Sequence, residues 1–262
     1  MSLSIQTNIE ALGAQRNLQT TENMLNTSME RLSSGLKINS AADDVAGYAI
    51  NQRLQGQVNG VAQATQNSQD AVSLVQTAQG ALNDVQQMLQ RVRELAVQYA
   101  NGTNTESDKE AIKGEATELE SEITRVGEAT KFNGVALLAK EEEIKFQIGA
   151  NEKETIGVKT TELKKAVAGI SVEKIESVEK AINEVSKAAA NFGSVQDRLQ
   201  YTQSNLAIYG ENLSAAQSSL ADANMAEEMT NFTKDQVLQQ AGVAILAQAN
   251  SLPQAVLKLV GG

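Results

Sequence analysis

The sequence predicts an all-α dominated fold: a long antiparallel helical rod, built like a coiled-coil bundle, with one small β-hairpin and paired N- and C-terminal helices. Hydrophobic residues make up 41% of the 262-residue chain, yet aromatic residues are only 3% and Trp is absent. Small aliphatic side chains suit narrow seams between helices better than a thick core built on large rings. Pro253 is the one proline, so almost nothing interrupts a helix. Apolar residues also recur every seven positions in two segments far apart in the sequence.

The first predicted helix covers residues 5–38, where apolar side chains recur at helical spacing. They are Ile9, Leu12, Leu18, Leu25, Met29, Leu32 and Leu36. Asp43 and Asp44 follow this segment and precede the second helix. A carboxylate in that place favours a helix start, as an N-cap and as a partner of the helix dipole.

Residues 54–99 carry the strongest periodic signal. Two series at seven-residue steps form the a and d positions of a seam over seven heptads, with polar exceptions at Gln57 and Ser68. The series are Leu54, Val61, Ser68, Val75, Leu82, Leu89 and Ala96, and Gln57, Ala64, Ala71, Ala78, Val85, Val92 and Tyr99. A helix of this length spans ~70 Å and needs an equally long partner. The Asn-Gly-Thr-Asn cluster at residues 101–104 ends it.

The middle of the chain changes from a helical period to a period of two. A helix is expected from about residue 106 to residue 128, followed by a turn at the Phe-Asn-Gly run of residues 132–134. Ile144, Phe146 and Ile148 then alternate with polar residues, and a similar run returns after a turn at residues 149–151. This pattern predicts one β-hairpin within residues 143–159.

A second long seam follows from near Val172 and is the natural partner of the first. Leucines seven apart alternate with a second series: Leu199, Leu206, Leu213 and Leu220, with Val195, Thr202, Tyr209 and Ala216. Two distant seams of similar length predict an antiparallel rod with neighbouring termini. We therefore predict a terminal helical domain from residues 1–44 plus 221–262, and a rod domain from residues 45–220.

The C-terminal helix has a composition that favours assembly with other copies. Its apolar residues are Met229, Phe232, Leu238, Ala241, Ile245, Leu252 and Val256, and residues 236–257 contain no charged side chain. A surface helix of a monomer normally carries Lys and Glu on its wet face, whereas neutral amides are buried at a lower cost than charges. One interpretation is that the end helices only pack on each other. The other is that they are mobile in the monomer and become ordered in a polymer.

Four sequence motifs resemble those of the bacterial flagellins, in the same order along nearly the whole chain. They are ERLSSGLKINSA at residues 30–41, LQRVRELAVQ at residues 89–98, QIGAN at residues 147–151, and LQQAG with LAQAN at residues 238–250. The flagellins have an outer variable domain inserted after the hairpin in most members, and this chain has no room for one. The resemblance is thus to a short form.

This resemblance implies a structural subunit that polymerises through its terminal helices into the flagellar filament. It implies contacts between copies at Leu32, Leu36, Ile38, Leu238, Ile245, Leu246, Leu252 and Val256. It also implies export by the flagellar type III apparatus without a cleaved signal, an extracellular location, and as partners an export chaperone, the cap and the hook–filament junction proteins.

The flagellin resemblance further implies recognition by the vertebrate Toll-like receptor 5 through Arg91, Leu95 and Glu115. In flagellins these residues also lie where neighbouring subunits pack. From the heptad positions, Arg91 falls at an exposed c position and Leu95 at a flanking g position. The alternative for both is an ordinary surface arginine with its stem on a flanking leucine.

Several other functions are disfavoured. A net charge of −10 argues against nucleic acid, and a chain without Cys or His lacks thiolate metal sites, the usual nucleophile–base pairs and any cofactor signal. The Glu run at residues 141–143 reads as a solvated loop rather than a cation site. No signal peptide or membrane-length apolar run is visible. The remaining alternatives are a hook–filament junction protein and an amphipathic lipid-binding protein, whose helices normally carry Lys and Arg along the polar face.

Overall fold

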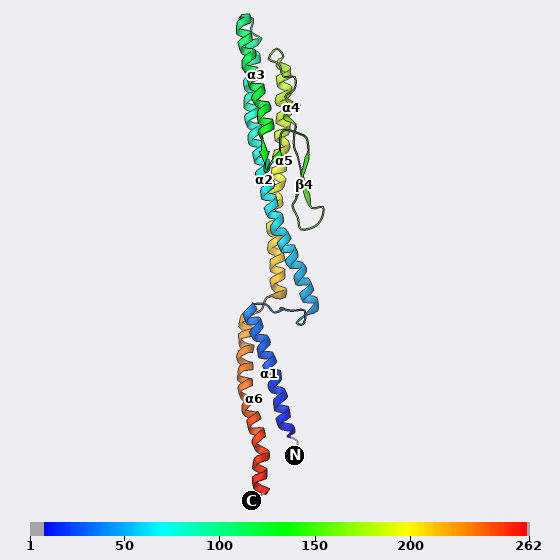
Figure 1. The fold of residues 1–262 in the computed structure, drawn as a ribbon, viewed down its shortest axis with the longest axis vertical. Coiled ribbons are helices and arrows are strands. Elements are labelled where there is room, and N and C mark those ends of the chain that lie inside the picture. The colour runs from blue at the N-terminus through cyan, green and yellow to red at the C-terminus, as the bar shows by residue number, and fades with distance from the viewer. Residues whose placement is uncertain (1–7, 261–262) are drawn as a thin grey trace. The chain divides into compact units, whose positions relative to one another are not determined.

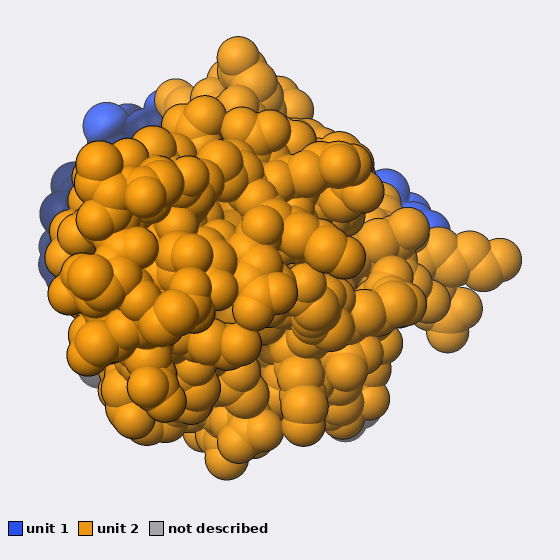
Figure 2. Space-filling view, turned by 90° about the horizontal axis from the view of Figure 1, so that it is seen from above, with its two compact units in different colours: residues 1–55, 214–262 blue, residues 56–213 orange. Residues whose placement is uncertain are grey.

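The computed structural model describes residues 8–260, with side chains described up to residue 251. The chain forms two compact units: one from residues 1–55 and 214–262, and the other from residues 56–213 (Figures 1 and 2). Their boundaries fall inside helices α2 (Val45–Tyr99) and α5 (Ile175–Ala221). The division at residues 44 and 220 therefore stays a prediction about domain organisation. The two units are called here the terminal unit and the rod unit.

Helices α2 and α5 pack antiparallel in the rod unit, as the two heptad seams predicted. Gln86 donates to the Ser186 hydroxyl at 3.3 Å, and nearer the end of α2 Arg93 pairs with Glu179 at 3.0 Å. Residue numbers thus rise along one helix while they fall along the other. All but three of the predicted seam residues of α2 are buried. Ser68 is buried without penalty because its hydroxyl donates to the Ala64 carbonyl at 2.9 Å.

The second seam differs from the prediction at two positions. Leu199, Leu206 and Leu213 are buried, but Tyr209 and Ala216 are exposed, so their assignment to the seam was wrong. A helix with 3.6 residues per turn drifts relative to a strict seven-residue repeat. In this part of α5 the drift turns Gly210 toward α2, where a Cβ at Gly210 would lie 3.4 Å from Val61.

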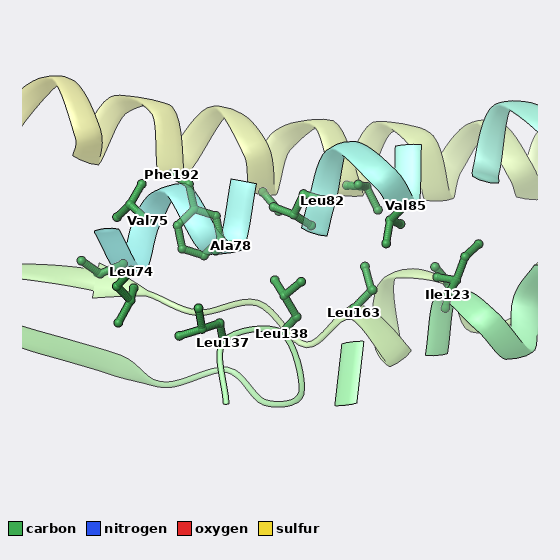
Figure 3. Packing of buried hydrophobic residues seen from close by; sticks show 14 of the residues in the cluster. Leu74, Val75, Ala78, Leu82, Val85, Ile123, Leu137, Leu138, Leu163 and Phe192 are labelled. Carbon is green, nitrogen blue, oxygen red and sulfur yellow. The ribbon is translucent and has the colours of Figure 1, made fainter. Parts of the chain in front are cut away.

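A third layer covers part of α2 and α5 (Figure 3). It contains helix α3 (Glu106–Ala129), a strand pair β1 (Lys131–Phe132) with β2 (Val135–Ala136), and the hairpin β3 (Glu143–Gln147) with β4 (Thr155–Lys159). The hairpin prediction is confirmed, whereas β1 and β2 were predicted only as a turn. Figure 3 shows side chains of α2 and α5 pointing toward Leu137, Leu138 and Leu163 of this layer.

Local sequence explains where α3 begins and how the chain returns to α5. Thr105 and Asp108 form a capping box at the start of α3, each side chain bonding the other's backbone N–H. After β4 the short helix α4 (Leu163–Ala166) leads to Ile175, where α5 starts slightly later than the prediction from Val172. Residues 160–174 are the whole connection between β4 and α5, so no further domain is inserted there.

The terminal unit contains α1 (Ile9–Ser34) and α6 (Met225–Val260), which run side by side in opposite directions (Figure 1). Helix α1 ends before residue 38 because Gly35 has a φ of 73°, a conformation that favours glycine. Asp44 then caps α2 as predicted, accepting hydrogen bonds from the backbone N–H groups of Ala46 and Gly47 at 3.0 and 2.9 Å. Residues 5–7 of the first predicted helix lie outside the described residues.

Candidate functional site

The contact between α1 and α6 follows a heptad pattern, but few of its residues are large and apolar. Most of the less exposed positions in α1 alternate by three and four residues: Ala11, Ala14, Leu18, Thr21, Leu25, Ser28 and Leu32. Those in α6 do the same: Glu228, Phe232, Asp235, Gln239, Gly242, Leu246 and Ala249. We call these fourteen residues the terminal seam. Small and polar members dominate it, so burial of apolar surface holds this pair together only weakly.

A cluster of polar side chains lies at the terminal seam, where the C-terminal end of α1 packs beside the N-terminal end of α6. Glu228 is 8% exposed, and it accepts a hydrogen bond from Arg31 at 3.0 Å and another from the Ser28 hydroxyl at 3.2 Å. Both carboxylate oxygens therefore have a partner, and the charge is balanced by the arginine. At the far end of the seam, the Asn8 side chain donates to the Ala249 carbonyl at 2.8 Å. These contacts set the register of α1 against α6.

The large apolar side chains of the terminal unit lie mainly outside the seam. Ile9 is 71% exposed, Ile245 60% and Val237 59%. The exposed set on α1 and α6 is Ile9, Leu12, Met24, Met29, Met225, Met229, Val237, Leu238, Val243 and Ile245, which we call the outer apolar faces. Many exposed large apolar side chains on one pair of helices are typical of an interaction site.

The predicted assembly residues whose side chains are described fall into three groups. Leu238 and Ile245 belong to the outer apolar faces. Leu32, Leu36 and Leu246 are partly exposed, and Leu32 and Leu246 lie in the seam. Ile38 is 4% exposed and packs beside Gly47, so its side chain is already covered within the subunit and offers no free contact surface. The side chains of Leu252 and Val256 lie outside the described residues.

The chain between α1 and α2 is held by its backbone to the end of α5 and to the connection between α5 and α6. Leu36 forms a bridge with Asp222, Lys37 donates to the Ala221 carbonyl at 2.6 Å, and Ala223 donates to the Gly35 carbonyl at 2.9 Å. Within the same turn, hydrogen bonds from Ser40 lower the pKa of the Asp43 carboxyl. The motif at residues 30–41 thus joins the segment after α1 to the connection between α5 and α6.

A second candidate site lies in the rod unit, where α2 and α3 meet. Arg91 donates to Glu115 from two nitrogens at 2.9 and 2.8 Å, and to Glu94 at 3.1 Å. The bond to Glu115 raises the pKa of the Arg91 guanidinium. The structure thus brings two of the three predicted residues together on an exposed surface.

Leu95 differs from its predicted position at the flank of the seam. It is 1% exposed and packs with residues of α3 and α5: Ile112, Ala116 and Val178. The flank assignment assumed two helices, and α3 adds a third that covers the g position. Leu95 therefore supports the surface that carries Arg91 and Glu115 and is not part of it.

Sequence analysis did not assign a role to Ser28, Arg31 or Glu228. The available signal was a basic residue next to a seam position of one end helix and an acidic residue at a seam position of the other. In the part of the chain that the structure describes, no three Asp, Glu, His or Cys residues are grouped to hold a metal ion, and no helix is long and apolar enough to cross a membrane.

Comparison with known proteins decides the family. The model of the bacterial flagellin N-terminal helical region matches residues 5–143, and that of the bacterial flagellin C-terminal helical region matches residues 175–260. The chain belongs to the bacterial flagellin family. These two regions contain both end helices and both long seams of the rod.

Curated flagellins align with this chain over almost all of both sequences. The flagellin of Halalkalibacterium halodurans is 42% identical, with 97% of this chain and 98% of that one aligned. The flagellin of Bacillus subtilis is 39% identical over 98% of this chain and all of that one. The crystal structure of Bacillus cereus flagellin has a TM-score of 0.50 and 30% identity, and covers 54% of this chain and 88% of that one. The protein is thus a structural subunit of the flagellar filament and not an enzyme.

Proposed function

We propose that the α1–α6 pair is the surface through which subunits polymerise, with the outer apolar faces covered by the terminal units of neighbouring copies. The observation that carries this proposal is the distribution of side chains, because small and polar residues make up most of the seam while most large aliphatic groups lie outside it. Covering about half of one such side chain contributes roughly 1 kcal/mol. The ten exposed side chains of the outer apolar faces together supply on the order of 10 kcal/mol against the cost of fixing a subunit in place.

The polar residues beside the outer apolar faces support the same proposal. From residue 236 to residue 251 the exposed polar side chains of α6 are all neutral: Gln236, Gln240, Gln248, Asn250 and Ser251. Neutral amides and hydroxyls bond to one another when two subunits meet, and they enter an interface at a much lower cost than charged groups. Both sides of α6 are therefore compatible with burial.

Seeded polymerisation tests this proposal. The double substitution Val243→Gln and Ile245→Gln removes exposed apolar surface from α6 and keeps a helix-compatible side chain. We expect the variant to remain folded in its rod unit and to fail to extend filament seeds in negative-stain microscopy. Val97→Gln, at a 56% exposed valine of the rod unit, is the matched control and should still elongate. Normal elongation by the α6 variant would contradict the proposal.

We also propose that the protein is extracellular and leaves the cell through the flagellar type III apparatus without losing a signal peptide. An export chaperone would cover the apolar C-terminal helix before assembly, and the cap and hook–filament junction proteins would meet the same terminal unit. The exposed apolar side chains of α6 support this, since they need a cover before polymerisation. The test is the N-terminal sequence of protein from sheared filaments: a shortened N-terminus would contradict uncleaved export, and so would secretion from cells that lack the type III apparatus.

A further proposed property is recognition by Toll-like receptor 5 through the surface of Arg91 and Glu115. Their ion pair is exposed, with about half of each side chain accessible, and lies on the solvent side of two packed helices. Arg91→Ala should reduce receptor signalling and leave the rod folded. Arg125→Ala removes a comparable exposed ion pair, with Glu122 of α3, and should not reduce it. Equal signalling by both variants would count against this property.

A further inference from the structure

The chain contains three Asn-Gly pairs, and the fold places each in a different backbone setting. They are Asn59-Gly60 in α2, Asn101-Gly102 in the loop between α2 and α3, and Asn133-Gly134 between β1 and β2. An asparagine before glycine is prone to lose ammonia, because no side chain shields the nitrogen that attacks its amide. We propose that Asn101 is a site of spontaneous deamidation in the folded protein and that the other two are protected.

The groups around Asn101 leave the reaction unhindered. Asn101 and Gly102 are exposed, and the Gly102 backbone N–H donates no hydrogen bond to any described residue. The Asn101 side-chain oxygen accepts a weak hydrogen bond from the Thr103 backbone N–H at 3.4 Å. That hydrogen bond draws electron density from the side-chain carbonyl of Asn101, so its carbon is attacked more readily by the Gly102 backbone nitrogen.

The reaction uses only this loop and water. The Gly102 backbone nitrogen attacks the side-chain carbonyl carbon of Asn101 and forms a C–N bond. The bond from that carbon to the side-chain nitrogen then breaks. The backbone N–H proton passes through water to the departing nitrogen, which leaves as ammonia. The product is a five-membered succinimide ring. Water then opens either of its two carbonyls, which leaves aspartate in one case and isoaspartate, joined through the side-chain carbon, in the other. No electrons are exchanged with an outside reagent.

The α2 pair is protected by hydrogen bonding and packing. Inside a helix the Gly60 N–H is bonded to the carbonyl four residues earlier, so it is not free to attack. A Cβ on Gly60 would lie only 2.8 Å from that of Ala150, which shows how closely the β3–β4 turn covers this part of α2. Ring closure at Asn59 therefore requires local opening of the longest helix of the rod.

The β1–β2 pair is protected by its turn conformation. Asn133 has a φ of 47° and Gly134 a φ of 82°, and both values are typical of a two-residue hairpin turn. Pairing of Phe132 with Val135 holds both ends of this turn. To close the ring, the Asn133 backbone must rotate out of that conformation and lose the strand pair.

The two products affect the loop differently. An aspartate at residue 101 keeps an oxygen acceptor for the Thr103 N–H and adds one negative charge near the start of α3. An isoaspartate lengthens the backbone by one carbon. It therefore displaces the loop residues that follow, including Asn104, whose side chain donates to the Gln98 carbonyl.

The experiment is incubation of the full-length protein at mildly alkaline pH, with peptide mass spectrometry at each of the three asparagines. We expect Asn101 to deamidate at least about tenfold faster than Asn59, the ratio that a local opening cost of about 1.4 kcal/mol imposes. In denaturant the three rates should become similar, since the difference arises from the fold. Comparable rates at Asn59 and Asn101 in the folded protein would overturn the proposal, and so would an unchanged difference in denaturant.

Gly102→Ala is the matched variant. A Cβ at Gly102 meets nothing within 4 Å, so the substitution leaves the loop intact. The added methyl group hinders the attacking nitrogen, and deamidation at Asn101 should slow several-fold while the rates at the other two sites stay the same. A loss of ammonia at Asn101 that is as fast in this variant as in the parent protein would refute the ring-closure route.

Discussion

The ion pair in the terminal seam leads to a quantitative prediction about assembly. Glu228→Gln keeps the size of the side chain and removes its charge, while Arg31 loses a charge-assisted hydrogen bond of 3.0 Å. Hydrogen bonds to charged groups contribute about 1.5–3 kcal/mol, and glutamine still accepts a weaker bond. Because the Arg31 side chain is 31% exposed, water partly replaces its lost partner. We therefore expect a loss of about 1–2 kcal/mol.

The critical concentration for seeded polymerisation measures this loss when the end helices become ordered on assembly. A change of about 1–2 kcal/mol corresponds to an increase of roughly five- to thirtyfold in critical concentration. Arg31→Gln should have a similar effect, and the double variant should lose much less than the sum of the two, since each single substitution disrupts the same contact. Glu184→Gln, which breaks an exposed ion pair with Lys187, is the control and should change the value little. Strict additivity of the two seam substitutions, or an unchanged critical concentration, would refute the reasoning.

Three further predictions concern the stability of the fold. Leu95→Ala should reduce the free energy of unfolding by about 2–5 kcal/mol, because Leu95 is fully buried between three helices, and chemical denaturation of the parent and the variant will measure it. Asp44→Ala should cost about 1 kcal/mol through the lost N-cap of α2, with Asp44→Asn as the conservative variant that retains most of it. Hydrogen bonds from Thr105 lower the pKa of Asp108, and those from Asn151 lower the pKa of Glu154. A carboxyl whose pKa is lower in the folded state than in the unfolded state stabilises the fold at pH values above its unfolded pKa. The free energy of unfolding should therefore fall as the pH drops from neutral through about pH 4. Urea titration at each pH should show a smaller fall for the double variant Asp108→Asn and Glu154→Gln than for the parent protein.

Much of the rod was predictable because its information is local. The seven-residue repeat of α2 depends only on which side chains recur on one helix face, and nearly all of its members are buried. The hairpin was equally accessible, since alternation along Ile144, Phe146 and Ile148 reports a period of two. The start of α3 followed from the same kind of short-range pattern.

Positions that depend on a neighbour from another part of the chain were not predictable. Leu95 was placed at a flank because nothing in a heptad repeat indicates a third helix. Tyr209 was placed in a seam because the repeat does not report how far a helix has drifted relative to its partner. Ile38 was counted as an assembly contact, although its packing beside Gly47 covers it within the subunit.

The sequence by itself determined that long helices form, which of their faces are apolar, and that residues 236–251 of the C-terminal helix carry no charge, because these properties belong to single segments. Only the tertiary structure decided which apolar faces remain uncovered. Pairing of α1 with α6 places Glu228 and Ser28 in the seam and leaves Ile9 and Ile245 outside it, because the register of two distant helices determines which face is buried. That uncovered surface is the one through which we propose that subunits contact each other.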